Sequence, residues 1–189
     1  MDHYIDIRLR PDPDFAPPML MEALYSKLHR ALFDLQATDI GVSFPQHKLG
    51  VNARTLGDHL RLHSTQARLT QLMQQPWLNG MRDHVSVGDI LAVPAEVQHR
   101  SVARKQFNTG NPSRAKRYAK RNGLAEEQAQ AIYDQVAEKR IALPFVQLNS
   151  RSTQQRFALF IEHGKPEPTP RPGEFNHYGL SPTATIPWF

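Results

Sequence analysis

Cysteine is absent from this chain of 189 residues. Its absence excludes disulfide bridges, thiolate zinc sites, iron–sulfur clusters and a cysteine nucleophile, and it argues against a secreted, disulfide-stabilised scaffold. No run approaches the roughly 20 apolar residues that a membrane helix needs, and the N-terminus alternates polar and apolar residues instead of resembling a targeting signal. We therefore expect a cytoplasmic protein that does not interact with a membrane.

Acidic residues are missing from one long internal segment. Residues 100–121 contain eight basic residues and no acidic one, although the chain as a whole has 23 basic and 18 acidic residues. All of the net charge of +5 therefore comes from this segment. Such a concentration of positive charge is typical of a polyanion-binding surface, and a solvated basic helix is the simpler alternative.

Several catalytic motifs are also lacking. The sequence has no phosphate-binding glycine loop, no dinucleotide fingerprint, no His-Glu-x-x-His and no Gly-x-Ser-x-Gly. His59 and His63 are spaced like metal ligands, but the sequence shows no obvious third ligand beside them. It also shows no cluster of carboxylates of the kind that holds the metal ions of a two-metal nuclease. We expect no metal and no cofactor, which leaves acid–base chemistry by histidine as the available mechanism.

The first 96 residues alternate between strand and helix patterns. Apolar residues at 5, 7 and 9 alternate with polar ones, which predicts a half-buried strand. Two prolines precede a segment with apolar residues at helical spacing, which predicts a helix over about 19–35. The same reasoning predicts the remaining elements: strands at 40–44 and 59–63 that pair, a helix at about 65–75, and extended structure at 85–93.

This βαββαβ order predicts a ferredoxin-like domain over residues 1–96. The outward faces of its strands carry polar residues, namely Asp6, Arg8, His59, Arg61 and His63. An RNA-recognition-motif sheet would instead carry aromatic residues that stack bases. If this domain contributes to RNA binding, it does not use that platform.

Residues 97–189 are expected to form a C-terminal α/β part. We predict a basic loop from 98 to 112, a short basic helix at about 113–121 ending at Gly123, and a further helix over 125–139. Strands at 144–148 and 156–162 form a hairpin, and the tail is rich in proline and glycine. The chain is thus predicted to be an α+β protein with an RNA-binding basic helix.

Individual residues suggest how RNA would be bound and cut. Arg104 and Gln106 are two residue types that can read base edges, although their spacing alone is weak evidence. His29 lies beside the apolar stripe of the first helix, where a histidine packed for structural reasons is the alternative. RNA can be cut without metal because its 2′-hydroxyl is a built-in nucleophile.

Many stretches of the chain resemble one known family. They are MDHYIDIRLRPDPDF, KLHRAL around His29, IGVSFP, LGDHLRLH, PWL, the Arg104-x-Gln106 segment, LPFVQLNSRSTQQRFALFIEHG, YGLS and the terminal PWF. Over nearly its whole length, the chain resembles the CRISPR-associated endoribonuclease of type I-F systems. That family cuts a repeat hairpin to make guide RNAs.

The resemblance implies a role for each candidate residue. His29 would be the general base toward the 2′-hydroxyl, Ser150 would hold that hydroxyl, and Tyr178 would orient the histidine. The RNA-binding residues would be Arg104 and Gln106 at the foot of the stem, Phe157 stacked on the closing base pair, and Lys116, Arg117, Lys120 and Arg121 in the major groove. The expected products are a 2′,3′-cyclic phosphate and a 5′-hydroxyl, formed without metal.

The resemblance also implies partners: CRISPR repeat stem-loop RNA, the mature guide RNA that stays bound, and the other subunits of the type I-F surveillance complex. The basic helix departs from the family pattern, with lysine at 116 and 120. Because lysine lacks the bidentate geometry of arginine, specificity would rest more on Arg104, Gln106, Arg117 and Arg121. Two other classes remain as alternatives: a non-catalytic subunit that caps guide RNA and a DNA-binding regulator.

Overall fold

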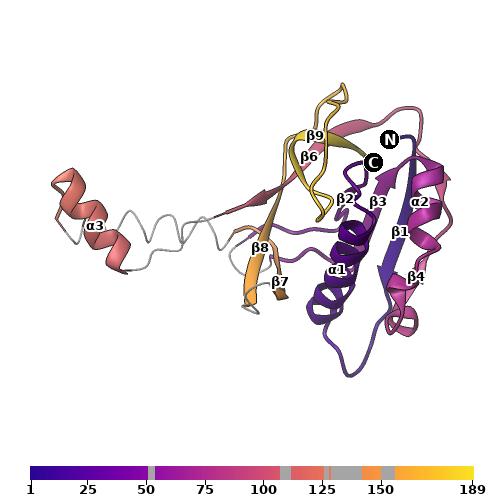
Figure 1. Ribbon diagram of the computed structural model, residues 1–189, viewed down its shortest axis with the longest axis horizontal. Helices are drawn as coiled ribbons and strands as arrows, with labels where there is room; N and C mark the ends of the chain where they lie inside the picture. The colour runs from indigo at the N-terminus through magenta and orange to yellow at the C-terminus, as the bar shows by residue number, and fades with distance from the viewer. Residues whose placement is uncertain (51–53, 107–111, 126–127, 129–141, 150–155) are drawn as a thin grey trace.

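The structure is a computed structural model that describes residues 1–189 except 51–53, 107–111, 126–127, 129–141 and 150–155. Two antiparallel sheets and three helices make up its regular structure within the described residues (Figure 1). The predicted α+β class is confirmed. In the part of the chain that the structure describes, no helix is both long and apolar enough to cross a membrane.

The first sheet contains five strands in the order β2-β3-β1-β4, with β5 also paired to β1. The strands are β1 (His3–Leu9), β2 (Gly41–Ser43), β3 (His59–Ser64), β4 (Val85–Val87) and β5 (Leu91–Ala92). Helix α1 (Pro17–Asp34) connects β1 to β2, and α2 (Gln66–Met73) follows β3, before two short 3₁₀ turns at Pro76–Leu78 and Arg82–His84. The order of elements agrees with the predicted one, including the paired strands β2 and β3.

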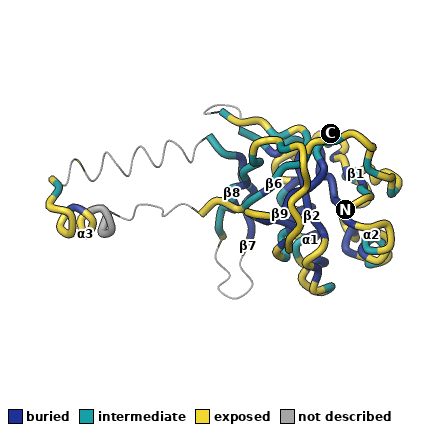
Figure 2. The backbone as a smooth tube through the Cα atoms, turned by 90° about the horizontal axis from the view of Figure 1, so that it is seen from above, coloured by how far each residue is buried: buried dark blue, intermediate teal, exposed yellow. Residues whose placement is uncertain are grey.

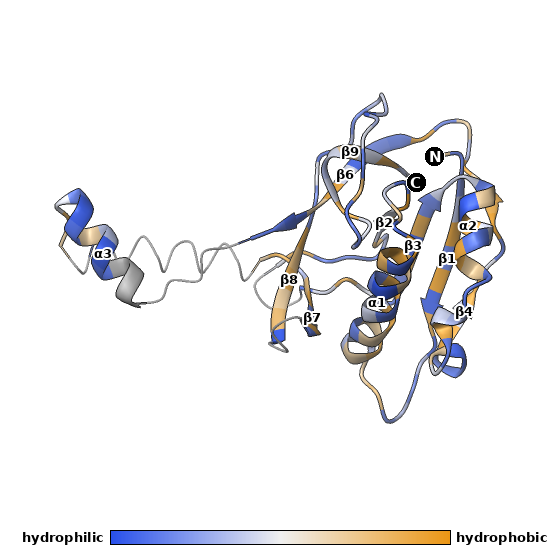
Figure 3. Cartoon of the chain, in the orientation of Figure 1, coloured by the Kyte–Doolittle hydropathy of each residue, from blue (hydrophilic) through white to orange (hydrophobic). Residues whose placement is uncertain are grey.

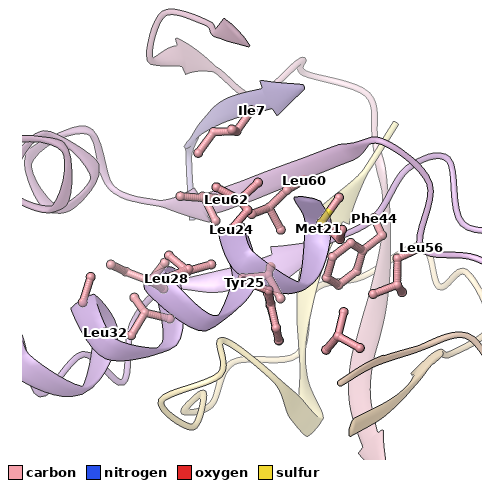
Figure 4. Packing of buried hydrophobic residues seen from close by; sticks show 14 of the residues in the cluster. Ile7, Met21, Leu24, Tyr25, Leu28, Leu32, Phe44, Leu56, Leu60 and Leu62 are labelled. Carbon is pink, nitrogen blue, oxygen red and sulfur yellow. The ribbon is translucent and has the colours of Figure 1, made fainter. Parts of the chain in front are cut away.

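Helix α1 forms because proline occupies its start and a stripe of apolar residues covers one side. Leu24, Leu28 and Leu32 are fully buried on that stripe. Figure 4 shows Leu24 beside Leu60 and Leu62 of β3. This packing fixes the position of the whole helix against the sheet, including the residues that border the stripe.

The face of β3 that carries its polar residues is buried, which corrects the prediction that these residues face outward. His59, Arg61 and His63 are all less than a tenth exposed. Arg61 donates from Nε and Nη2 to the Asp6 carboxylate at 2.6 and 3.0 Å, and its guanidinium lies 4.1 Å from the centre of the Phe189 ring. The C-terminal residues therefore cover a face that the strand pattern alone leaves exposed.

The second sheet has the order β7-β8-β6-β9. Its strands are β6 (Gln98–Lys105), β7 (Phe145–Asn149), β8 (Arg156–His163) and β9 (Ser181–Trp188). The predicted hairpin is confirmed by the pairing of β7 with β8. One prediction was wrong, because β6 lies where we expected a basic loop. The sequence patterns also predicted no strand for the tail rich in proline and glycine, where β9 lies. Both strands obtain their backbone partners from distant segments, which local patterns do not reveal.

The two sheets share one hydrophobic core. Leu148, Leu159 and Ile161 of the second sheet belong to the same buried cluster as the apolar residues of α1 and β3. Gly41 of β2 allows this contact, since a side chain there would collide with Ile186 and Phe175. The predicted boundary between residues 1–96 and 97–189 stays a prediction.

Helix α3 (Pro112–Asn122) confirms the predicted basic helix. Gly123 follows it with φ +64°, a conformation that favours glycine and ends the helix. Figures 1 and 2 show α3 away from the two sheets, and Figure 3 shows that its described residues are mostly hydrophilic. The helix predicted over 125–139 lies almost entirely outside the described residues.

Candidate functional site

His29 is held in one orientation at the border of the buried stripe of α1. It is half-buried and follows the fully buried Leu28. Its Nδ1 lies 2.8 Å from the carbonyl oxygen of His177. Because a carbonyl oxygen only accepts hydrogen bonds, Nδ1 carries a proton, and the neutral form of the ring has its lone pair at Nε2. That lone pair is the acceptor that a general base requires.

Tyr178 lies flat against the imidazole. The ring centres of His29 and Tyr178 are 3.9 Å apart with an angle of 12° between the planes. Burial raises the pKa of the Tyr178 hydroxyl, and the positive charge of Arg104 partly offsets that rise. The phenol is therefore neutral near neutral pH, and its ring restricts rotation of the histidine.

The segment that carries Tyr178 is a tight turn. The Asn176 side-chain oxygen accepts hydrogen bonds from the backbone N–H groups of Tyr178 at 2.9 Å and Leu180 at 3.2 Å. Gly179 has φ +70°, and a side chain there would collide with Val42. Its carbonyl accepts a hydrogen bond from the Val42 N–H at 2.9 Å. The turn is thus fixed internally and against β2.

Arg104 and Phe157 form a second pair near this site. Arg104 lies near the end of β6, is exposed, and has its guanidinium carbon 5.6 Å from the centre of the Phe157 ring. Phe157, on β8, is half-buried and packs against the core. The influence of Arg104 on the Tyr178 hydroxyl indicates that it lies in the neighbourhood of the histidine site. Gln106 is exposed and directly follows β6.

The four predicted cations of the basic helix are exposed on α3. Lys116, Arg117, Lys120 and Arg121 occupy positions that place them on one broad side of a helix, whereas Ala119 between them is buried. Lys116 with Lys120 and Arg117 with Arg121 are like-charge pairs one turn apart, which repel each other. A bound polyanion would relieve that repulsion.

Ser150 lies outside the described residues, directly after the last residue of β7. The described part of the chain has no group of three or more His, Asp or Glu residues able to hold a metal ion. There, His59 contacts Asp6 at 2.8 Å and His63 contacts Ser43 at 2.9 Å. These two histidines, whose spacing in the sequence is like that of metal ligands, thus contact different side chains.

Sequence reasoning missed two groups at this site. The His177 carbonyl orients the imidazole, and the hydroxyl of Tyr25 donates to the Tyr178 carbonyl at 2.7 Å. The spacing of Tyr25 and His29 by four residues could have indicated that both lie on one side of α1. No local pattern could have indicated the contacts with a segment about 150 residues further along, which depend on tertiary structure.

Comparison with known proteins identifies the family to which the chain belongs. Residues 4–189 match the family described as "CRISPR-associated protein (Cas_Csy4)". Two curated relatives are each called "CRISPR-associated endonuclease Cas6/Csy4". The chain is 44% identical to the protein of Pseudomonas aeruginosa (strain UCBPP-PA14) and 45% identical to that of Escherichia coli (strain UTI89 / UPEC), over 100% of both chains in each comparison. A match over nearly all of the chain shows that the protein belongs to the Cas_Csy4 family of CRISPR-associated proteins.

Proposed function

We propose that the protein is an endoribonuclease that binds the stem-loop of CRISPR repeat RNA and cuts at the 3′ base of the stem. The orientation of His29 carries the proposal, because the bond from its Nδ1 to the His177 carbonyl makes Nε2 the basic nitrogen of the neutral ring. The names of the two relatives, both CRISPR-associated endonucleases, support the same class of activity.

The proposed reaction uses the RNA's own nucleophile. Nε2 of His29 takes the proton of the ribose 2′-hydroxyl, and the 2′-oxygen attacks the adjacent phosphorus. The bond between phosphorus and the 5′-oxygen breaks, and that oxygen takes a proton from water as it leaves. The products are a 2′,3′-cyclic phosphate and a 5′-hydroxyl. Tyr178 keeps the imidazole aligned, and Ser150 holds the attacking hydroxyl.

Binding is assigned to positive, polar and aromatic side chains other than those proposed to act in proton transfer. Lys116, Arg117, Lys120 and Arg121 neutralise phosphates of the stem, whose loop end gives a helix access to the groove. Arg104 and Gln106 read the base pairs at the foot of the stem, and Phe157 stacks on the closing pair. This division predicts that cleavage and binding respond to different substitutions.

The test uses the repeat hairpin and two chemical variations. The protein is incubated with the hairpin in EDTA, and the same experiment is repeated with a 2′-deoxy nucleotide immediately 5′ of the scissile phosphate. We expect cleavage in EDTA, a cyclic phosphate on the upstream product, and no cleavage of the deoxy hairpin. Dependence on added metal, or cleavage of the deoxy substrate, would contradict the mechanism.

The other two classes give different results in the same assay. Tight binding without cleavage would identify a subunit that only caps guide RNA. Equal affinity for a DNA hairpin of the same sequence would identify a DNA-binding regulator. We further propose that the protein stays on the product hairpin with the other subunits of a type I-F surveillance complex in the cytoplasm. Co-purification of the cleaved hairpin with the protein tests this retention.

A further inference from the structure

Three consecutive backbone carbonyls of the Tyr178 turn accept hydrogen bonds from the N-terminal half of the chain. The His177 carbonyl accepts from His29 and the Gly179 carbonyl accepts from the Val42 N–H. Between them, the Tyr178 carbonyl accepts from the hydroxyl of Tyr25 at 2.7 Å. The peptide group that carries the stacking ring is thus fixed by a side chain one helical turn before the proposed general base.

Tyr25 is suited to hold that peptide group permanently. Its side chain is fully buried, and its ring packs against Phe44 with the ring centres 5.6 Å apart. Burial raises the pKa of the Tyr25 hydroxyl well above its ordinary value, with a smaller contribution from Tyr178. The hydroxyl therefore keeps its proton and acts as a donor across the physiological pH range. Figure 4 shows Tyr25 on the same helix as the core residues Leu24 and Leu28.

We propose that Tyr25 is a positioning residue for cleavage: it fixes the Tyr178 peptide so that the Tyr178 ring stays stacked on His29. The inference rests on the proposed role of His29 as general base. The Tyr25 hydroxyl is buried and donates to the Tyr178 carbonyl, so its effect passes through the turn at residues 176–180. Because α1 carries both Tyr25 and His29, the position of this helix determines both the position of the proposed base and that of the Tyr178 ring stacked on it.

Removing only the hydroxyl tests this role without emptying the core. In Tyr25→Phe the aromatic ring stays, while the carbonyl of Tyr178 loses its donor. The bonds from His29 to His177 and from Val42 to Gly179 still hold the two flanking peptides. The turn therefore stays docked, but the stacking ring gains freedom to tilt. Small losses of alignment in an active site reduce rate more than binding.

The matched control is Ser64→Ala. The Ser64 hydroxyl is also buried and donates to a backbone carbonyl, that of Asp39, at 2.8 Å. Ser64→Ala therefore loses the same kind of hydrogen bond without removing one that the turn at residues 176–180 accepts. Both variants, the wild type and His29→Ala are compared in single-turnover cleavage of the repeat hairpin, in affinity for the 2′-deoxy hairpin, and in thermal unfolding.

We expect Tyr25→Phe to cleave about tenfold more slowly than the wild type, with unchanged affinity for the deoxy hairpin. Ser64→Ala should lose similar thermal stability and cleave at the wild-type rate. Nitrogen NMR of the imidazole should show the Nδ1-protonated form in both the wild type and Tyr25→Phe, because the bond to the His177 carbonyl remains. An unchanged rate in Tyr25→Phe, or an equal loss of rate in both variants, would overturn the inference. If His29→Ala itself cleaves normally, the proposed function fails instead.

Discussion

Neutralising part of helix α3 should weaken RNA binding in a way that depends on salt. The perturbation is the double substitution Arg117→Ala with Arg121→Ala, which removes two exposed cations one turn apart. Alanine has the highest helix propensity, and the two arginines repel each other in the unbound helix. The substitutions should therefore strengthen the helix itself, so that any lost affinity reflects lost contacts with RNA.

The magnitude follows from counterion release. Each phosphate contact contributes about 0.9 to the slope of log affinity against log salt for duplex DNA, so two lost contacts lower the slope by about 2. Between about 50 and 200 mM salt, two such contacts weaken wild-type binding by about tenfold. The advantage of the wild type over the variant should therefore shrink about tenfold across this range.

The assay is titration of a labelled 2′-deoxy hairpin at several salt concentrations. Arg8→Ala with Arg82→Ala is a matched control, because both arginines are exposed and lie on the first sheet and the 3₁₀ turn before β4, at the opposite end of the molecule from α3 (Figure 1). The control should keep the wild-type slope. Equal slopes in the wild type and the α3 variant, or an equal drop in both variants, would refute the assignment of α3 to phosphate binding.

Other substitutions separate cleavage from stability. Tyr178→Leu should reduce single-turnover cleavage about tenfold and leave hairpin affinity unchanged, since it removes the aromatic stack; an unchanged rate would contradict an orienting role. Burial lowers the pKa of His63 to about 3 and that of His163 to about 2. The unfolded chain therefore binds more protons below about pH 6.5, and the free energy of unfolding should fall by about 1.4 kcal/mol per pH unit for each histidine. Urea unfolding measured between pH 7.5 and 5 tests this decrease in stability. His163→Phe should make the decrease smaller, and a stability that does not change with pH would contradict the prediction. Burial alone would raise the pKa of Asp6, but hydrogen bonds from His59 and Arg61 lower it well below its usual range. Asp6→Asn should therefore lower the free energy of unfolding by about 2–3 kcal/mol at pH 7. A change within experimental error would contradict a stabilising role for these hydrogen bonds.

The first half of the fold was predictable because its local patterns agree with its packing. Ile5, Ile7 and Leu9 alternate along β1, and all three are buried. β6 escaped prediction because only Val102 among its eight residues is buried, so it carries no alternating signal. Its strand conformation comes from pairing with β8 and β9, which are distant in sequence.

The burial of Arg61 could not be predicted for a similar reason. Its alternation with apolar neighbours correctly placed it on the face opposite the core of α1. The residue that covers it, Phe189, comes 128 positions later and contributes a ring and a carbonyl oxygen. Together with the Asp6 carboxylate, these groups satisfy a cation that would otherwise be costly to bury.

The candidate site was predictable in its residues but not in its construction. Resemblance identified His29 and Tyr178, and the structure brings their rings into contact. The roles of the His177 carbonyl and the Tyr25 hydroxyl could not be predicted from the sequence. Every residue has a backbone carbonyl, so this acceptor is not marked by a residue type, and a buried tyrosine has the same sequence pattern as any other aromatic residue of the core. The proposed roles of Ser150 and of the cations on α3 stay predictions.

Single-turnover cleavage by His29→Ala tests the central claim most directly. Without the imidazole, the 2′-hydroxyl has no base, so the rate constant for cleavage of bound hairpin should fall by about 10² to 10⁴. Affinity for the 2′-deoxy hairpin should stay at the wild-type value, because the cations and aromatic side chains assigned to binding are intact. A variant that binds and cuts the hairpin at the wild-type rate would contradict the assignment of proton transfer to His29.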